Sequence, residues 1–306
     1  MATSDEAEYK KDFIRGVIVN TAGAVLLTLV ACITPRAWLL VVIALAIQLL
    51  VFAFHGLPYN SEKYYDLSGS CTHFAIVLTS LMMCPGGASP QQVLYGLFST
   101  VWMVRLGTFM YIRILRDGRD PRFDNIKKVK IRFLGVWVLQ ACWVVIVQLP
   151  VILVASFEDT SPAVAHALNV FVLLVWLSAF LLETVADVQK FEFRQQSDNR
   201  HKFITSGLWR YARFPNYCGE IVMWTAAAAG ASVIGVFSDN PTMHFAWLSP
   251  AFTVFLLLKL SGVPLLTAAG DKKWGSDPAY QHYVQHTNLL IPWKPAPPLA
   301  GYQQLY

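Results

Sequence analysis

The sequence predicts an all-α protein, a polytopic bundle of transmembrane helices with about eight spans. Apolar residues make up 55% of the 306 residues and charged residues only 14%, against roughly 45–50% and about 25% in soluble domains. The mean hydropathy, +0.46, points the same way. The apolar residues also gather into runs near the twenty or so residues that a helix needs to cross a bilayer. Composition and run length therefore indicate the same fold class.

Eight apolar runs are candidate spans, and their lengths are compatible with any number from seven to nine. The third run is short and ends at "CPGG", so we expect it to be tilted or broken and shielded by its neighbours. In chain order the runs are Gly16–Ile33, Ala37–Phe54, Thr72–Cys84, Val93–Ile112, Phe133–Phe157, Ala163–Ala186, Tyr217–Phe237 and Phe245–Leu260.

The charged residues favour one side of the membrane. Segment 113–132 carries eight basic residues against three acidic ones, and segment 187–216 carries six against three. An eight-span count places both segments and both termini on one side. Because basic loops stay on the cytosolic side, we predict that the termini and these loops face the cytosol or matrix. The endoplasmic reticulum, a bacterial inner membrane and a mitochondrial inner membrane are not distinguished.

No internal repeat divides the chain, so residues 1–306 are predicted to form a single membrane domain. Within it, the spans of residues 1–112 are expected to line a lipid cavity, and residues 113–293 to carry the functional core. The last segment, "KPAPPLAGYQQLY" (294–306), is rich in proline and predicts an extended strap.

Several kinds of site are not indicated. The sequence has no Gly-rich dinucleotide fingerprint, no phosphate-loop lysine motif and no paired-cysteine zinc motif. The five cysteines are scattered, which does not suggest a disulfide framework. His282 and His286 are spaced i, i+4 but lack a third ligand nearby, so a solvated surface is favoured over a metal site. No nucleic-acid partner is expected.

A polar cluster stands out between the sixth and seventh spans. If the sixth helix continues past the membrane, Asp187, Lys190 and Arg194 share one face. Asn216 and Glu220 are again i, i+4, at the start of the seventh span. Ionisable residues at such depth are costly unless they are paired or face water. The cluster therefore predicts a functional pocket, with snorkelling side chains and a capping Asn as the alternative.

The residue types suit an anionic adenine dinucleotide. Lys190, Arg194 and Arg213 could hold phosphates. Asn216 could bond an amide or a ribose, and rings such as Trp209 could stack on a base. Asp187 and Glu220 would then orient the basic groups or accept ribose hydroxyls.

At these residues the chain resembles the steroid 5α-reductase-like superfamily, in particular its bacterial and organellar branch. The resemblance runs from about residue 60 to 293, with the motifs in the family's order. They are "YYDLSGS" (64–70), "VRLGTFMYIRILRDGRDPRF" (104–123), "ETVADVQK" (183–190), "GLWRYARFPNYCGE" (207–220), "SGVPLL" (261–266) and "DPAYQHYVQHTNLLIPW" (277–293).

The resemblance implies a membrane reductase that transfers hydride from NADPH to a carbon–carbon double bond in a lipid or sterol-like enone. It carries the cofactor-contacting positions onto Asp187, Arg194, Asn216 and Glu220. The same motifs add a further set with less defined roles, which is Arg213, Tyr217, Tyr280 and Tyr283. Tyr65 and Asp66 are the candidate acids for the substrate carbonyl, since either could donate a hydrogen bond to a developing enolate. An interfacial Tyr beside a helix-capping Asp is the alternative.

Three positions depart from the family pattern. Phe214 stands where relatives usually carry His, Thr267 where a Glu is common, and Phe123 where Tyr is frequent. The first two remove hydrogen-bonding groups from the expected pocket.

The sequence leaves three functions open. The first is the lipid enone reductase. The second is a non-catalytic subunit that keeps the reductase fold within a larger membrane complex, such as a mitochondrial respiratory complex, as Phe214 and Thr267 suggest. The third is an S-adenosylmethionine-dependent enzyme similar to the prenylcysteine methyltransferases, which share an Arg-x-Pro-x-Tyr turn. Membrane lipids, and in the second case other membrane subunits, are the expected partners.

Overall fold

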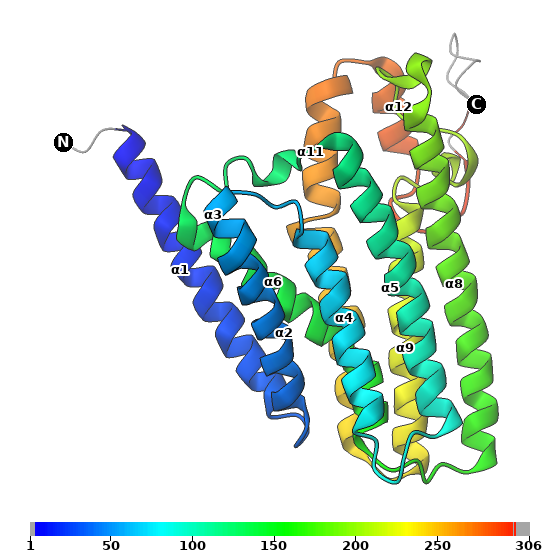
Figure 1. Cartoon of the computed structure of the whole chain (residues 1–306). Coiled ribbons are helices and arrows are strands. Elements are labelled where there is room, and N and C mark those ends of the chain that lie inside the picture. The colour runs from blue at the N-terminus through cyan, green and yellow to red at the C-terminus, as the bar shows by residue number, and fades with distance from the viewer. Residues whose placement is uncertain (1–3, 296, 298–306) are drawn as a thin grey trace. The chain divides into compact units, whose positions relative to one another are not determined.

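Helices make up all the regular elements that the structure, a computed structural model, describes over residues 4–295 and 297 (Figure 1). Seven of the helical segments are long and apolar enough to cross a membrane. They are Glu6–Ala31, Ala37–Tyr59, Pro90–Asp117, Lys130–Val147, Ala163–Gln195, Pro215–Phe237 and Pro241–Trp274. The predicted fold class, an all-α polytopic bundle, is confirmed.

The predicted third span forms a helix, α4 (Tyr65–Met82), but this helix is not among the seven. Its first residues, "YDLSGS", are polar, and their side chains form hydrogen bonds and ion pairs within the protein. The side of the membrane on which each terminus lies stays a prediction. The Pro-rich strap predicted at 294–306 falls almost entirely outside the described residues.

The chain divides into two compact units. Unit 1 comprises Met1–His166 and Ala231–Ser249, and unit 2 comprises Ala167–Gly230 and Pro250–Tyr306. Their boundaries fall inside three helices, α8 (Ala163–Gln195), α9 (Pro215–Phe237) and α10 (Leu248–Phe255). The two units are described separately below.

Close contacts between long helices hold unit 1 together (Figure 1). Helix α1 (Ser4–Ala31) packs along α6 (Lys130–Val147) and α2 (Ala37–Val51), and α4 packs between α2 and α5 (Pro90–Asp117). Gly16 permits the first contact, because a Cβ there would lie 2.7 Å from the Arg132 backbone nitrogen. A π turn (Phe52–Gly56) and a short helix, α3 (Leu57–Tyr59), prolong α2.

The fifth apolar run, Phe133–Phe157, was expected to be one span, and the structure corrects this. Helix α6 ends at Val147 and α7 begins at Leu149 and ends at Ser156. Pro150 at the start of α7 has no N–H to continue the ladder of α6. Gln148 at the break is fully buried, and its amide bonds the Ser99 hydroxyl at 2.5 Å and the His73 ring at 2.9 Å. Polar side chains inside unit 1 thus form hydrogen bonds with one another, because no water is available to them there.

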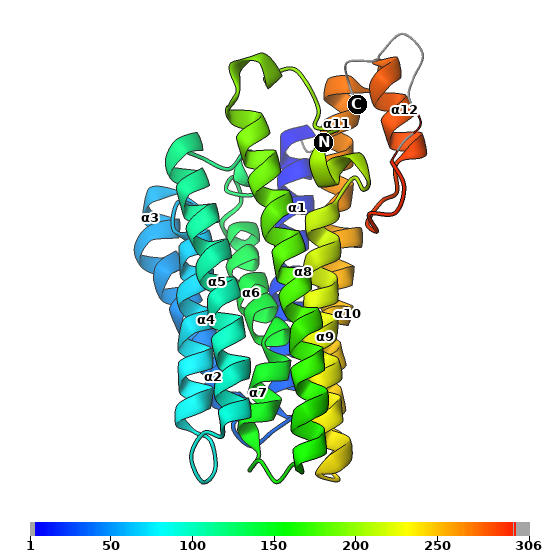
Figure 2. The ribbon, with the colours of Figure 1, turned by 90° about the vertical axis from the view of Figure 1, so that its right-hand side faces the viewer.

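Unit 2 contains the larger parts of α8, α9 and α10, then a π turn (Leu256–Leu260), α11 (Val263–Trp274) and α12 (Pro278–His286). Helices α8 and α9 lie side by side, and α11 and α12 stand near one end of them (Figure 2). Gly219 of α9 sits directly against α8, since a Cβ there would come within 2.7 Å of the Ala179 carbonyl oxygen. Only glycine allows so close an approach.

Candidate functional site

The segment 207–214 is fastened to α8 at its start. The Leu208 N–H donates to Gln189 Oε1 at 2.8 Å, and the Trp209 indole donates to the Ala186 carbonyl at 2.9 Å. Gly207 has φ +60°, and a Cβ there would lie 2.4 Å from Gln189 Oε1. A side chain at this position would therefore strain the backbone and displace the contact. Trp209 is buried as a result.

The same segment is fastened to the chain after α12 at its end. The N–H groups of Arg213 and Phe214 donate to the carbonyls of Asn288 and Leu289 at 2.8 and 3.0 Å. The Tyr283 hydroxyl on α12 donates to the Trp209 carbonyl at 2.7 Å. Pro215 then begins α9 with a residue that needs no hydrogen-bond acceptor for its nitrogen. The segment is thus a fixed wall.

A cavity of about 490 Å³ opens beside this wall, wholly within unit 2. Six basic side chains line it, and the described part of the chain contributes no Asp or Glu to the lining. Seven aromatic rings complete most of the rest. The basic residues are Lys190, Arg194, Arg200, Lys202, Arg213 and Lys273; the rings are Phe193, Phe203, Trp209, Phe214, Trp274, Tyr280 and Tyr283. We refer to this as the basic pocket.

Five of the nine predicted cofactor positions line the basic pocket. They are Lys190, Arg194, Arg213, Tyr280 and Tyr283. Helix α8 does continue to Gln195, as the shared face of Asp187, Lys190 and Arg194 required. The Lys190 ammonium lies 4.3 Å from the centre of the Trp209 ring, a cation–π contact that holds the charge at the pocket wall.

The other four predicted positions do not line the pocket. Asn216 Nδ2 donates to Asp187 Oδ1 at 3.0 Å, which joins α9 to α8. Tyr217 stacks on Phe214 with ring centres 5.4 Å apart and 4° between planes. Glu220 is half-buried one helical turn further along α9. These residues stand behind the pocket wall, and their contact with a cofactor stays a prediction.

The two departures from the family pattern in this region both face the pocket, since Phe214 and Thr267 are lining residues. The third, Phe123, lies in unit 1, where its ring packs edge-on against Tyr65 with centres 5.0 Å apart. Two of the three departures therefore alter the pocket itself.

Sequence analysis missed half of the basic lining. Arg200, Lys202 and Lys273 come from the loop before Gly207 and from α11. The Lys273 ammonium donates to the Arg200 carbonyl at 2.8 Å, and the Trp274 indole donates to the His201 carbonyl at 2.6 Å. The alternation of basic and aromatic residues in "RHKF" and "DKKW" was the available signal, but it says nothing of which segments meet.

The tyrosine hydroxyls of the pocket are uncharged donors. Burial and the carboxylate of Asp271, whose Oδ1 accepts from the Tyr280 hydroxyl at 3.2 Å, raise the pKa of Tyr280 to about 12. Burial likewise raises the pKa of Tyr283 well above its usual range. Neither phenol therefore adds negative charge to the pocket near neutral pH.

Two polar atoms at the pocket and behind it are buried without a hydrogen-bond partner among the described residues. They are Arg213 Nε, a donor, and Asn216 Oδ1, an acceptor. A buried polar atom in that condition costs about 1–3 kcal/mol. A ligand or water would relieve both costs.

Tyr65 and Asp66, the predicted acids, belong to unit 1. The Tyr65 hydroxyl donates to the Val136 carbonyl at 3.1 Å, and its ring packs against Trp137. Asp66 faces Arg113 at 3.6 Å. Burial raises the pKa of Asp66, while the nearby guanidinium groups of Arg113 and Arg122 oppose that rise. Their catalytic role stays a prediction.

The basic segment 113–132 meets carboxylates. Arg113 and Arg122 both contact Asp120, at 3.4 and 2.5 Å, and Lys127 contacts the buried Glu62 at 2.6 Å. Glu62 also accepts from the Asp120 N–H at 2.8 Å. Burial raises the pKa of Asp120, but hydrogen bonds and charge from Arg122 outweigh it and leave the pKa below its usual value. These contacts tie the segment to the start of α4.

His282 and His286 stack with ring centres 4.1 Å apart, and His282 Nε2 lies 2.8 Å from the Pro297 carbonyl. Across the described residues, no group of three or more His, Cys, Asp and Glu side chains could hold a metal ion. The five cysteines are free thiols.

Comparison with known proteins finds a single kind of match. A family model described as "Protein of unknown function (DUF1295)" matches residues 51–287, and this family lies in the steroid 5-alpha-reductase-like superfamily. No curated protein and no solved structure matches the chain. The match spans the basic pocket together with Tyr65 and Asp66.

Proposed function

We propose a function from the premise that this chain belongs to the DUF1295 family of the steroid 5-alpha-reductase-like superfamily. The proposed function is NADPH-dependent reduction of a carbon–carbon double bond in a lipid or sterol-like enone within the membrane. The basic pocket of unit 2 is the proposed cofactor site. One observation carries the proposal, namely six basic and seven aromatic side chains around a single cavity with no described carboxylate in its lining.

The lining fits the chemistry of the cofactor. NADPH carries several phosphate charges and two flat rings, which match cationic and aromatic side chains respectively. The volume of about 490 Å³ lies within the roughly 300–1,000 Å³ of ligand sites. A pocket of like charges is unfavourable by itself, because six cations repel one another. An anionic ligand removes that repulsion.

Each group of residues has a proposed role. Lys190, Arg194 and Arg213 would hold phosphates, and the open Arg213 Nε supplies a donor for a forked contact. The rings of Phe203 and Trp274, which pack edge-on against each other with centres 5.9 Å apart, would offer an aromatic surface for a base to stack on. The Asp187–Asn216 pair would present the open Asn216 Oδ1 to an N–H or O–H donor of the cofactor.

The reduced nicotinamide supplies hydride when it is bound. The protein must then stabilise charge on the enone oxygen and deliver a proton. Asp66 is our candidate donor, because burial raises the pKa of its carboxyl above the usual value while Arg113 and Arg122 oppose that rise. Tyr65, a neutral phenol beside it, is the second candidate.

A pair of adjacent lysines tests the cofactor site. Lys273 lines the pocket and Lys272 does not, although both are exposed on α11. We expect Lys273→Ala to weaken NADPH binding to the detergent-purified protein several-fold, measured by titration calorimetry, and Lys272→Ala to leave it unchanged. Absence of any NADPH affinity in the wild-type protein would refute the proposal.

Phe214 and Thr267 favour a second candidate, a subunit that keeps the fold inside a larger membrane complex without catalysis. Co-purification from native membranes distinguishes the two, because a lone protein that reduces an enone with NADPH excludes the second. The methyltransferase alternative is not favoured. A cation-lined pocket is a poor match for the sulfonium of S-adenosylmethionine.

A further inference from the structure

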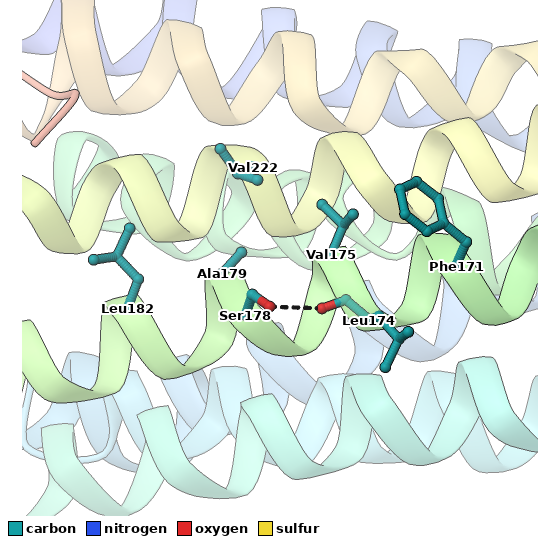
Figure 3. Close-up of a pocket in the computed structure, with 7 residues that line it drawn as sticks. All are labelled: Phe171, Leu174, Val175, Ser178, Ala179, Leu182 and Val222. Atoms are coloured by element: carbon teal, nitrogen blue, oxygen red, sulfur yellow. Dashed lines mark hydrogen bonds between the residues drawn. The ribbon is translucent and has the colours of Figure 1, made fainter. Parts of the chain in front are cut away.

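A second hollow lies along α8 and α9 in unit 2, at membrane depth. It is an open groove of about 410 Å³ lined by Phe171, Leu174, Val175, Ser178, Ala179, Leu182 and Val222. Figure 3 shows six of these side chains on α8 and Val222 on the neighbouring turn of α9. The single hydroxyl is already satisfied, because Ser178 donates to the Leu174 carbonyl at 2.9 Å. The groove therefore offers only apolar contact.

The groove is a hollow and not a flat helix surface. Gly219 brings α9 within contact of Ala179 and Glu183, so the helices meet closely at the floor. Phe171 and Leu174 stand out at the rim, with 67% and 57% of their surfaces exposed. Both helices lie in membrane-spanning segments, Ala163–Gln195 and Pro215–Phe237. What reaches this hollow from outside the protein is therefore hydrocarbon.

The groove points toward the basic pocket. Leu182 and Phe193 are eleven residues apart on α8, close to three full turns, and so lie on nearly the same face. Leu182 lines the groove and Phe193 lines the pocket. From Leu182 to Lys190 the helix rises only about 12 Å.

A polar junction separates the two hollows. On α8, Asp187 lies between Leu182 and Lys190; Asn216 lies between Arg213, just before α9, and Val222 of α9. Asn216 Oδ1 is the buried acceptor that has no partner among the described residues. Along the two helices the order is an apolar groove, then a polar junction with an open acceptor, then the basic pocket. That order matches an amphiphile.

We infer that the α8–α9 groove binds the hydrocarbon chain of the lipid substrate, so that the polar end of that lipid lies beside the Asp187–Asn216 junction, next to the cofactor that Asn216 Oδ1 would accept from. The chain reaches the groove sideways from the bilayer. The inference rests on the proposed function, because it makes the groove a subsite of the reductase. A single linear chain, acyl or isoprenoid, is the proposed occupant. The lining runs along one face of α8 and takes a single residue from α9, an arrangement that suits a chain extended along α8 better than a fused-ring sterol.

A photoreactive chain tests the inference. The full-length protein in lipid nanodiscs is incubated with palmitic acid carrying a diazirine midway along its chain, and the labelled residues are mapped by mass spectrometry. We expect saturable labelling between residues 171 and 182 and at Val222, suppressed at least several-fold by excess unlabelled palmitic acid. A parallel arm uses a diazirine sterol, for which we expect no saturable labelling there.

Two tryptophan variants provide the matched comparison. Ser178→Trp fills the groove from an exposed position, and Leu181→Trp places the same ring at an exposed position of α8 that is not part of the lining. We expect the first to abolish saturable labelling and the second to leave it intact. Labelling that is unsaturable, equal on the Leu181 face, or saturable only with the sterol overturns the inference.

NADPH affinity, measured on the same preparation, separates the two claims. If NADPH binds and the groove is not labelled, the groove assignment fails and the reductase proposal stands. If the groove is labelled and NADPH does not bind, the groove is not a substrate subsite and the reductase proposal fails with it.

Discussion

In the basic segment 113–132 of unit 1, cations meet carboxylates at close range, as Lys127 meets Glu62 and Arg122 meets Asp120. In the basic segment 187–216 of unit 2, five basic side chains instead line a cavity to which no described carboxylate contributes. Both segments carry more basic than acidic residues, eight against three in 113–132 and six against three in 187–216. The net charge of a segment therefore predicts on which side of the membrane it lies. Whether its basic residues form a candidate binding site depends on where the carboxylates are.

The largest expected effect is on NADPH affinity when Arg213 is replaced, and it tests whether the two basic segments differ in function. Arg213→Ala removes a forked donor, and hydrogen bonds to charged groups contribute about 1.5–3 kcal/mol. We expect NADPH to bind roughly 10- to 100-fold more weakly, by titration calorimetry, with an unchanged melting temperature. Arg119→Ala, an equal loss of charge in segment 113–132, should leave the affinity as it is. Equal losses in both variants would show that the charges act only through the total field.

Glu62→Gln tests whether the ion pairs of segment 113–132 stabilise the fold and play no part in binding. It leaves Lys127, with 15% of its side chain exposed, without a charged partner, which costs about 1–3 kcal/mol. We expect a lower melting temperature in detergent and an unchanged Kd for NADPH. The exposed Glu192→Gln is the control for the loss of one carboxylate. A weakened Kd with normal stability would place segment 113–132 in the cofactor site.

Tyr283→Phe sharpens the description of the pocket wall. It removes the bond to the buried Trp209 carbonyl, with an expected loss of about 1 kcal/mol in the free energy of unfolding. Chemical denaturation measures this loss, and Tyr211→Phe, which alters a more exposed phenol, should be neutral. A stable Tyr283→Phe variant would mean that the wall is held without this bond.

The smallest expected effect is a dependence on pH. Because the folded pKa of Asp120 lies below its unfolded value, its contribution to stability is present above about pH 3.9. That contribution is lost as the pH falls through the folded pKa. Asp120→Asn should flatten the decline in melting temperature below pH 4, while the exposed Asp198→Asn should not. An unchanged decline in the Asp120 variant would show that the ion pairs of Asp120 in segment 113–132 do not contribute to stability.

The fold could be predicted largely from run length and hydropathy, because those two properties set how a helix crosses a bilayer. All eight apolar runs are helical in the structure. The break at Gln148 was not foreseen, since the residues on either side are uniformly apolar and only Pro150 marks it. The polar start of α4 was missed for a related reason, because Ser68 is satisfied by Gln48, which lies on another helix.

Residues of the pocket could be predicted only where they lie close together in the sequence, on one helix or in the turn before one. Lys190 and Arg194 followed from the spacing on α8, and Arg213 from the turn before α9. Lys273 and Trp274 could not be placed, because their position depends on how α11 returns toward the loop at Arg200. The pairing of Asp187 with Asn216 also depends on the register of two helices, which no local pattern specifies.

A structure of the full-length protein in nanodiscs, determined with NADPH present, tests the central claim most directly. The account predicts nucleotide density in the basic pocket of unit 2, with phosphates within hydrogen-bonding distance of Lys190 and Arg213. Ordered NADPH against segment 113–132, or an empty basic pocket at saturating NADPH, would contradict it.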